Sequence, residues 1–133
     1  MNLGKKDYET LLNLRNAIRR YVRFTEEGAR EAGLTPQQHQ LLLAIKGQPD
    51  KDWATVKELA EALQLKHQTV VGLVDRCETA DLVERQPSTT DKRQVRVVLS
   101  EKGEGILELL STRNMAELRS LEHWLRPPTH ETQ

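Results

Sequence analysis

Residues 55–100 read TVKELAEALQLKHQTVVGLVDRCETADLVERQPSTTDKRQVRVVLS, and they begin with two short amphipathic segments. The apolar positions of the first segment are Val56, Leu59, Ala60 and Leu63, and those of the second are Val70, Leu73, Val74 and Cys77. Both sets follow the i, i+3, i+4, i+7 spacing of a helix with one buried face. The stretch therefore predicts two helices that bury facing stripes across a turn near Gln64 and Leu65.

The starts and ends of these two helices differ in their chemistry. Thr55 and Glu58 form a T-x-x-E capping box, in which each side chain satisfies a free backbone N–H of the first turn. The second helix opens on Lys66, which has no acceptor for those N–H groups and adds charge at the positive end of the helix dipole. Asp81, just past this helix, tolerates a left-handed backbone better than most residues other than glycine. We expect a well-capped first helix, a weakly capped second helix and a tight turn after it.

After Glu78 the periodicity changes from helical to that of strands. Residues 82–85 are β-prone, and residues 95–99 alternate with the period of two of a half-buried strand. Residues 86–91 have turn chemistry and only Pro87 as an apolar residue, so we expect them to project into solvent as a wing. Helix, turn, helix and hairpin in this order predict a winged helix-turn-helix, which can place its second helix in a DNA groove.

Four segments in this order, LAEALQL (59–65), TVVGLVDR (69–76), DKR (91–93) and LSEKG (99–103), resemble the MarR family of winged-helix transcription regulators. The resemblance is close over residues 34–110. It implies a mainly α (α+β) single domain over residues 1–133, with a DNA-binding core at about 34–100, dimerisation helices at 1–30 and 101–126, and a tail at 127–133. Gly72 departs from the family, whose members commonly carry a longer polar side chain there.

The resemblance also implies which residues contact double-stranded DNA. They are Lys66, His67, Gln68, Thr69, Val71, Gly72, Arg76, Arg85, Asp91, Lys92, Arg93 and Arg96. Arg93 matches the wing arginine that reaches the minor groove, and Asp91 would steady the loop; an exposed ion pair is the alternative. Lys92 and Arg96 are expected to be phosphate ligands or solvated charges. Asp75 would either hold Arg93 in the DNA-bound pose or pair with a neighbour such as Arg76.

Composition agrees with a small regulator. The chain has 133 residues, with 20 Lys and Arg against 20 Asp and Glu, so any DNA-binding charge must be local. Residues 85–102 carry five basic and two acidic side chains, which predicts few phosphate contacts and a strong dependence on two subunits. The chain has no apolar run of membrane-span or signal-peptide length, so we expect a cytoplasmic protein.

The flanking segments predict helices that need a partner. A helix over residues 6–25 carries a broad apolar face, a second begins at the capping box of Thr35 and Gln38, and a last one is capped by Ser100. Residues 47–52 form the clearest internal loop. Because uncovered apolar stripes mark interfaces, and because the resemblance implies the same, we expect a homodimer on a pseudo-palindromic operator. The dimerisation residues would be Tyr8, Leu11, Ile18, Leu118, Leu121 and Leu125.

Three residues on these helices suggest an effector site. By resemblance, Arg15, Arg19 and His39 border a pocket between the dimerisation and DNA-binding regions. The arginines would favour a small anionic or aromatic effector. For His39 the sequence favours an ordinary, partly buried helix residue over a ligand contact. The function implied is that of a ligand-responsive repressor.

Other classes of protein find less support in the sequence. Cys77 lies on the apolar stripe of the second helix, which favours a buried hydrophobe over a redox sensor. No nucleophile–base pair, paired acids, phosphate-binding glycine loop or metal-ligand spacing is present, so we expect neither an enzyme nor a cofactor. The main rival is a winged-helix module for protein interaction that has lost DNA binding; the neutral charge and Gly72 favour it slightly.

Overall fold

The computed structural model describes residues 2–88, 90–91 and 93–125. Their elements are α1 (Lys5–Glu31), α2 (Pro36–Lys46), β1 (Trp53–Ala54), α3 (Val56–Leu63), α4 (His67–Thr79), β2 (Val83–Pro87), β3 (Val95–Leu99) and α5 (Glu101–Leu125). This is the mainly α, winged helix-turn-helix arrangement that the sequence predicts. In the described residues, no helix has the length and apolar content that crossing a membrane requires.

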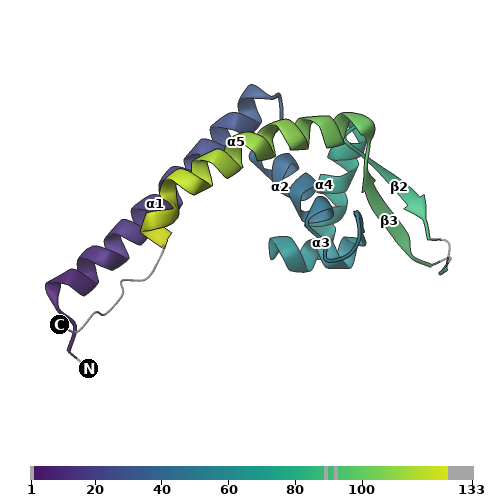
Figure 1. The fold of residues 1–133 in the computed structure, drawn as a ribbon. Helices are drawn as coiled ribbons and strands as arrows, with labels where there is room; N and C mark the ends of the chain where they lie inside the picture. Colours follow the sequence, from purple (N-terminus) through teal and green to yellow (C-terminus); the bar gives the residue numbers. More distant parts are fainter. Residues whose placement is uncertain (1, 89, 92, 126–133) are drawn as a thin grey trace.

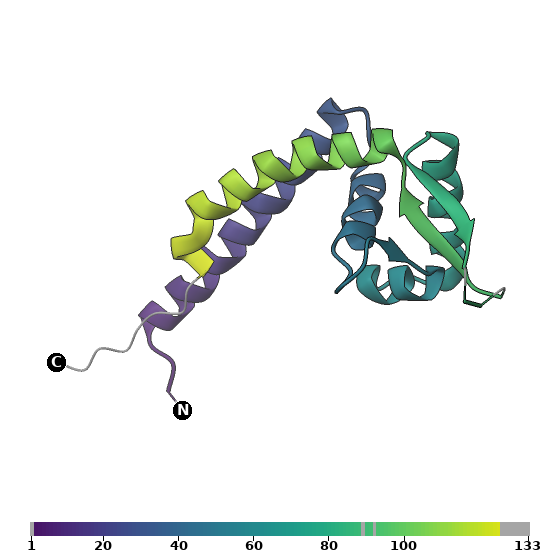
Figure 2. The ribbon, with the colours of Figure 1, turned by 45° about the vertical axis from the view of Figure 1, so that its right-hand side comes forward.

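The elements form an arm and a body (Figure 1). Helices α1 and α5 run side by side and make the arm, and the first turns of α1 extend past the end of α5 in both views (Figure 2). The body lies at the other end, where α2, α3 and α4 pack together and the β2–β3 hairpin projects from them as the wing. The arm therefore leaves long helix faces uncovered, while the body is a packed unit.

The hydrophobic core of the body joins the helix-turn-helix to α2 and the sheet. Its fully buried side chains include Leu41, Leu42, Ile45, Leu59, Val70, Leu73, Val74 and Val97. Val70, Leu73 and Val74 of the predicted α4 stripe belong to this set, and Cys77, the fourth residue of the stripe, is also fully buried. Each such side chain contributes about 1.5–3 kcal/mol relative to an exposed position. This burial fixes which face of α4 is left for solvent.

The sheet has three antiparallel strands in the order β1-β3-β2. Trp53 of β1 pairs with Val98, and Val83 of β2 pairs with Leu99. The sequence did not reveal β1, because two residues carry no periodicity and the pairing joins segments more than forty residues apart. Strand β2 begins one residue later than the predicted run and continues to Pro87.

The predicted capping residues are confirmed in atomic detail. The Thr55 hydroxyl accepts a hydrogen bond from the Glu58 N–H at 3.2 Å, and the Glu58 carboxylate accepts one from the Thr55 N–H at 2.9 Å. The Ser100 hydroxyl accepts from the Gly103 N–H at 2.9 Å. Lys66 makes no side-chain cap, as predicted, and Asp81 has a positive φ of 60°.

The first helix is longer than the expected 6–25, since α1 continues to Glu31. Its last turns are stabilised by packing rather than by local signals. Gly28 and Ala29 are buried, and a Cβ at Gly28 would lie 3.7 Å from the Leu110 side chain of α5.

Candidate DNA-binding surface and ligand cavity

The first turn of α4 presents a polar face to solvent. Lys66, His67, Gln68 and Thr69 are exposed, and within the described residues their side chains have no hydrogen-bond or ion-pair partner. On the opposite side, Val70 and Leu73 are buried in the body. The donors and acceptors of this turn are therefore free to contact another molecule.

The middle of α4 is less open. Val71 and Gly72 are half-buried, and the guanidinium of Arg76 lies 3.7 Å from the position of a Cβ at Gly72. Arg76 thus covers the glycine and occupies part of the space that a longer side chain at residue 72 would fill.

Hydrogen bonds shape the tip of the wing. The Ser88 hydroxyl accepts bonds from the N–H groups of Thr90 and Asp91, each at 3.2 Å. The Asp91 carboxylate accepts a bond from the Arg93 N–H at 2.9 Å, as expected for a residue that steadies the loop. The Arg93 side chain is exposed and has no partner in the described part of the chain. Lys92 lies outside the described residues.

Arg85 connects the wing to the candidate recognition helix. Its guanidinium donates to Asp75 at 2.7 Å and to Glu78 at 2.9 Å, and its backbone N–H donates to Glu78 at 3.2 Å. In this structure Asp75 pairs with Arg85 and not with Arg76, the neighbour expected from the sequence. The pairing of Asp75 with Arg93 was expected for the DNA-bound pose and stays a prediction. The sequence alone could not identify Arg85 as the partner of Asp75, because the fold of the hairpin determines which basic residue lies next to α4.

Arg96 is held against an aromatic ring instead of projecting from the wing. Its guanidinium carbon lies 4.0 Å from the ring centroid of Trp53, and the Lys51 ammonium lies 3.7 Å from the same centroid. The Arg96 Nε is buried and has no hydrogen-bond partner among the described residues. Trp53 was missed by sequence reasoning, although its position two residues before the capping box could have marked it.

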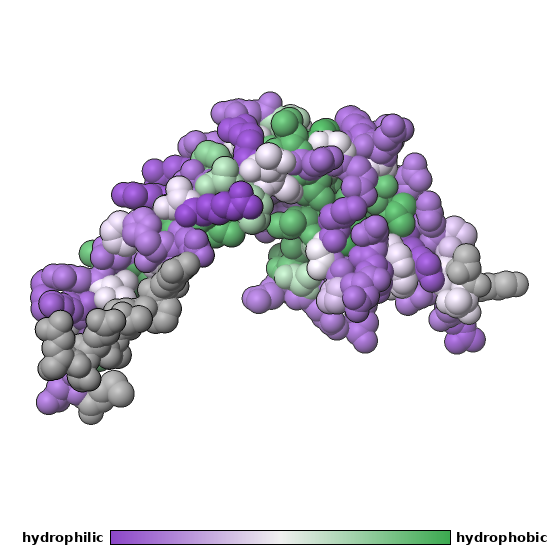
Figure 3. All heavy atoms as spheres, viewed as in Figure 1, coloured by the Kyte–Doolittle hydropathy of each residue, from purple (hydrophilic) through white to green (hydrophobic). Residues whose placement is uncertain are grey.

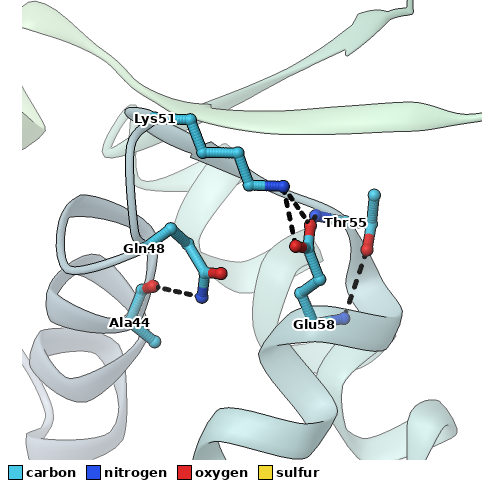
Figure 4. Close-up of polar contacts among 5 residues, drawn as sticks. All are labelled: Ala44, Gln48, Lys51, Thr55 and Glu58. Atoms are coloured by element: carbon cyan, nitrogen blue, oxygen red, sulfur yellow. Dashed lines mark hydrogen bonds and ion pairs between the residues drawn. The ribbon is translucent and has the colours of Figure 1, made fainter.

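The same lysine reaches the cap of α3 (Figure 4). Lys51 contacts both carboxylate oxygens of Glu58, at 2.7 and 2.8 Å, while Glu58 also accepts the Thr55 N–H. Burial alone would raise the pKa of Glu58, but the hydrogen bonds from Lys51 and the Thr55 backbone outweigh it and lower that pKa below its ordinary value. A chain of contacts thus links the wing strand β3, through Trp53 and Lys51, to the start of the helix-turn-helix.

The residues expected at the dimer interface fall into two groups. Tyr8, Leu11 and Ile18 are exposed on α1, as an interface requires. Leu121 is only 6% exposed, because it packs within its own chain; its expected exposure is wrong, since α5 turns this side chain towards the arm's own core. Leu118 is half-buried, and the Leu125 side chain lies outside the described part.

A cavity of about 330 Å³ lies between α1, α2 and α5. His39 and Asn114 line it and are 6% and 8% exposed, and burial lowers the pKa of the His39 imidazole below its usual range. The cavity does not include Arg15 or Arg19; both are exposed, and Arg19 donates to Asn16 at 2.9 Å. Only His39 of the three expected effector residues is therefore brought to the cavity. Figure 3 shows hydrophobic side chains gathering where the arm joins the body.

Cys77 is the buried hydrophobe that its stripe predicts. It is fully buried in α4, and burial raises the pKa of its thiol to about 11. The sulfur therefore stays protonated near neutral pH, which makes it a poor nucleophile.

Comparisons with known proteins agree with this geometry. A MarR family model matches residues 32–94. The HTH-type transcriptional repressor NicR of Pseudomonas putida is 30% identical over 107 residues, which are 79% of this chain and 66% of NicR, just under two thirds of its length. The transcriptional regulator Tm0710 of Thermotoga maritima is 26% identical with a TM-score of 0.67, over 92% of this chain and 83% of that one. AbsC, a MarR family transcriptional regulator from Streptomyces coelicolor, shares the fold with a TM-score of 0.72 and 21% identity, over 96% and 86% of the two chains.

Proposed function

We propose that this chain, which belongs to the MarR family of DNA-binding transcriptional regulators, binds a pseudo-palindromic operator as a homodimer and represses transcription in response to a small ligand. Each protomer would insert α4 into the major groove and place its wing against the neighbouring minor groove. Such a regulator acts on chromosomal DNA, so we propose the cytoplasm as its location.

The observation that carries this proposal is the polar turn at the start of α4. Lys66, His67, Gln68 and Thr69 are exposed without partners in the described chain, on a helix whose other face is fixed in the core. Amide and hydroxyl groups can donate to and accept from base edges, and Lys66 can pair with a phosphate.

The charges of this surface indicate how the binding energy is divided. Arg85 is neutralised by Asp75 and Glu78, and Arg96 lies on Trp53. The basic side chains free for DNA are therefore fewer than the sequence suggests, with Lys66, Arg76 and Arg93 exposed. Few phosphate contacts in each protomer favour a dimer that engages two half-sites about one helical turn apart.

The arm provides the surface for such a dimer. Tyr8, Leu11, Leu12 and Ile18 are large apolar residues of α1 that remain exposed. Exposed apolar patches of this kind mark protein interfaces. A second copy of the chain is the partner that this proposal assigns to them, with a two-fold axis passing between the arms.

Selection from a random double-stranded DNA library tests this function, followed by binding titrations at several salt concentrations and light scattering of the free protein. We expect an enriched sequence with two-fold symmetry, affinity that falls with salt, and a dimer at micromolar concentration. A monomer would exclude the proposed assembly. Salt-independent binding with no enriched sequence would favour the protein-interaction module instead.

A further inference from the structure

The cavity between α1, α2 and α5 contains polar side chains that the protein itself leaves unpaired. His39, Ser111 and Asn114 line it, and none of them has a side-chain hydrogen bond within the described residues. His39 and Asn114 are more than nine-tenths buried. Among the described residues only Arg96 Nε is a fully enclosed polar atom without a partner, so the polar atoms of His39 and Asn114 remain open to the cavity. A bound molecule can therefore donate to them and accept from them.

The walls of the cavity are apolar where it opens. Val22, Leu43 and Met115 line it and are between 44% and 50% exposed, although large apolar side chains usually pack away from water. A ligand with an apolar body would cover them, and the thioether of Met115 favours contact with an aromatic ring. Apolar walls with a few convergent polar groups are the usual form of a small-molecule site.

The electrostatics of the cavity exclude a carboxylate as the preferred ligand group. Within the described residues, no lysine or arginine lines it, and Glu26 lines it as a carboxylate. Two of the cations near it are already engaged: Arg30 pairs with Glu26 at 3.4 Å, and Lys46 of α2 pairs with Glu104 at 3.3 Å. Moving an anion from water to a site without a counter-charge carries a large desolvation penalty.

We propose that the cavity binds an uncharged aromatic molecule with a hydrogen-bonding group of the carboxamide type, and that it discriminates against the matching carboxylate. A neutral imidazole and a primary amide each offer one kind of donor and one kind of acceptor, so His39 and Asn114 match a group that both donates and accepts. A carboxylate only accepts and adds negative charge beside Glu26. This inference deepens the proposed ligand response and reverses the anionic preference that the sequence suggested from Arg15 and Arg19.

Benzamide, benzoate and benzamidine test the inference, because they share size and shape and differ in charge. Calorimetric titration of the full chain at pH 7.5 should show benzamide binding about tenfold or more tightly than benzoate, a difference of about 1.4 kcal/mol. Equal or tighter binding of benzoate overturns the proposal. Tighter binding of benzamidine than of benzamide would mean that the cavity prefers a cation, which overturns the neutral ligand. If none of the three compounds binds, the cavity is not a site for aromatic molecules of this size.

Two variants and one control variant test where the molecule binds and what sets the selectivity. Asn114→Leu should lose benzamide binding, with folding checked by circular dichroism. Gln40→Arg adds a cation at an exposed position of the lining and should raise benzoate affinity about tenfold, whereas Gln37→Arg, exposed on the same helix outside the lining, should not. If both arginine variants behave alike, the discrimination does not arise from the cavity.

These titrations contain no DNA, so they separate this inference from the proposed function. Benzamide binding by a chain that fails to select DNA would support the cavity chemistry and reject the regulator. Selection of an operator by a chain that does not bind benzamide would support the regulator and reject the cavity chemistry.

Discussion

The guanidinium of Arg85 in β2 and the carboxylate of Asp75 in α4 form an ion pair of 2.7 Å between the wing and the proposed recognition helix. Glu78, one turn further along α4, binds the other side of the same guanidinium at 2.9 Å. Asp75 is largely exposed, so the pair contributes little to folding. Its value lies in holding the hairpin at a fixed angle to α4 and in neutralising two carboxylates beside the proposed DNA surface.

Removing Arg85 should therefore weaken operator binding without unfolding the protein. For Arg85→Ala we expect about a tenfold loss of affinity, or about 1.4 kcal/mol, because Asp75 and Glu78 are then unpaired anions near DNA. Adding Asp75→Asn and Glu78→Gln to Arg85→Ala should restore most of the affinity. Fluorescence anisotropy at fixed salt measures the affinity of the wild type, of Arg85→Ala and of the triple variant. Affinity that stays low in the triple variant would show instead that Arg85 contacts DNA directly, as the sequence suggested.

The stacking of Arg96 and Lys51 on Trp53 predicts a difference in stability between two substitutions. Trp53→Ala removes the ring that both cations cover, and we expect it to lower the free energy of unfolding by about 2 kcal/mol. Arg96→Met keeps the aliphatic stem on the ring and removes the buried, unpaired Nε, so its loss should stay below about 1 kcal/mol. Urea denaturation at one protein concentration provides the comparison. Equal losses would mean that the Arg96 charge, rather than the ring, dominates the contact.

The parts of the fold that the sequence predicted are those governed by local chemistry. The capping box of Thr55 and the cap at Ser100 act through residues three positions away, and the apolar stripe of α4 follows helical geometry. The starts of these helices and the buried face of α4 could therefore be read from spacing alone.

The parts that it missed depend on which segments meet in space. Strand β1 exists because Trp53 pairs with Val98, and α1 continues past residue 25 because Gly28 packs on α5. The lining of the cavity likewise depends on which segments meet in space. Sequence reasoning identified the exposed turn at Gln68, but it could not show that Arg19 lies outside the cavity.

The pairing of Glu58 with Lys51 predicts a pH-dependent contribution to stability. The lowered pKa of Glu58 means that the folded state favours the carboxylate, so the gain is full above the ordinary value of 4.5 and is lost as pH falls through the lowered value. Glu58→Gln keeps an acceptor for the Thr55 N–H and loses only the charge. We expect it to be less stable than the wild type by about 0.5 kcal/mol at pH 7, and we expect this difference to shrink as the pH is lowered below 4.5. Thr55→Ala should instead cost about 1 kcal/mol at either pH, and a pH-independent Glu58→Gln would contradict the pairing.

The two elements of the proposed DNA surface should respond differently to substitution. Arg93→Ala removes one exposed cation per protomer and should reduce the slope of log affinity against log salt by about 2 per dimer. Gln68→Ala removes a neutral amide, so it should weaken operator binding, relax sequence preference and leave the salt slope unchanged. Titrations of the selected operator and of scrambled DNA at several salt concentrations distinguish the two effects. If both variants bind the operator as tightly as the wild type, neither residue contacts it.

Two glycines near the start of α5 should respond in opposite directions to alanine. A Cβ at Gly103 would lie 2.1 Å from the Leu82 carbonyl oxygen, and this oxygen also accepts the Ser100 N–H at 3.0 Å. The backbone cannot move away without breaking the junction of the wing and the arm, so Gly103→Ala should cost about 3 kcal/mol or more. Gly105 is exposed with nothing within 4 Å of its added Cβ, so Gly105→Ala should raise stability by about 0.5–1 kcal/mol through helix propensity. Thermal and urea unfolding of the pair test this directly. Tolerance of Gly103→Ala would mean that α5 does not approach Leu82 this closely, and the angle between arm and wing would then lack its steric constraint.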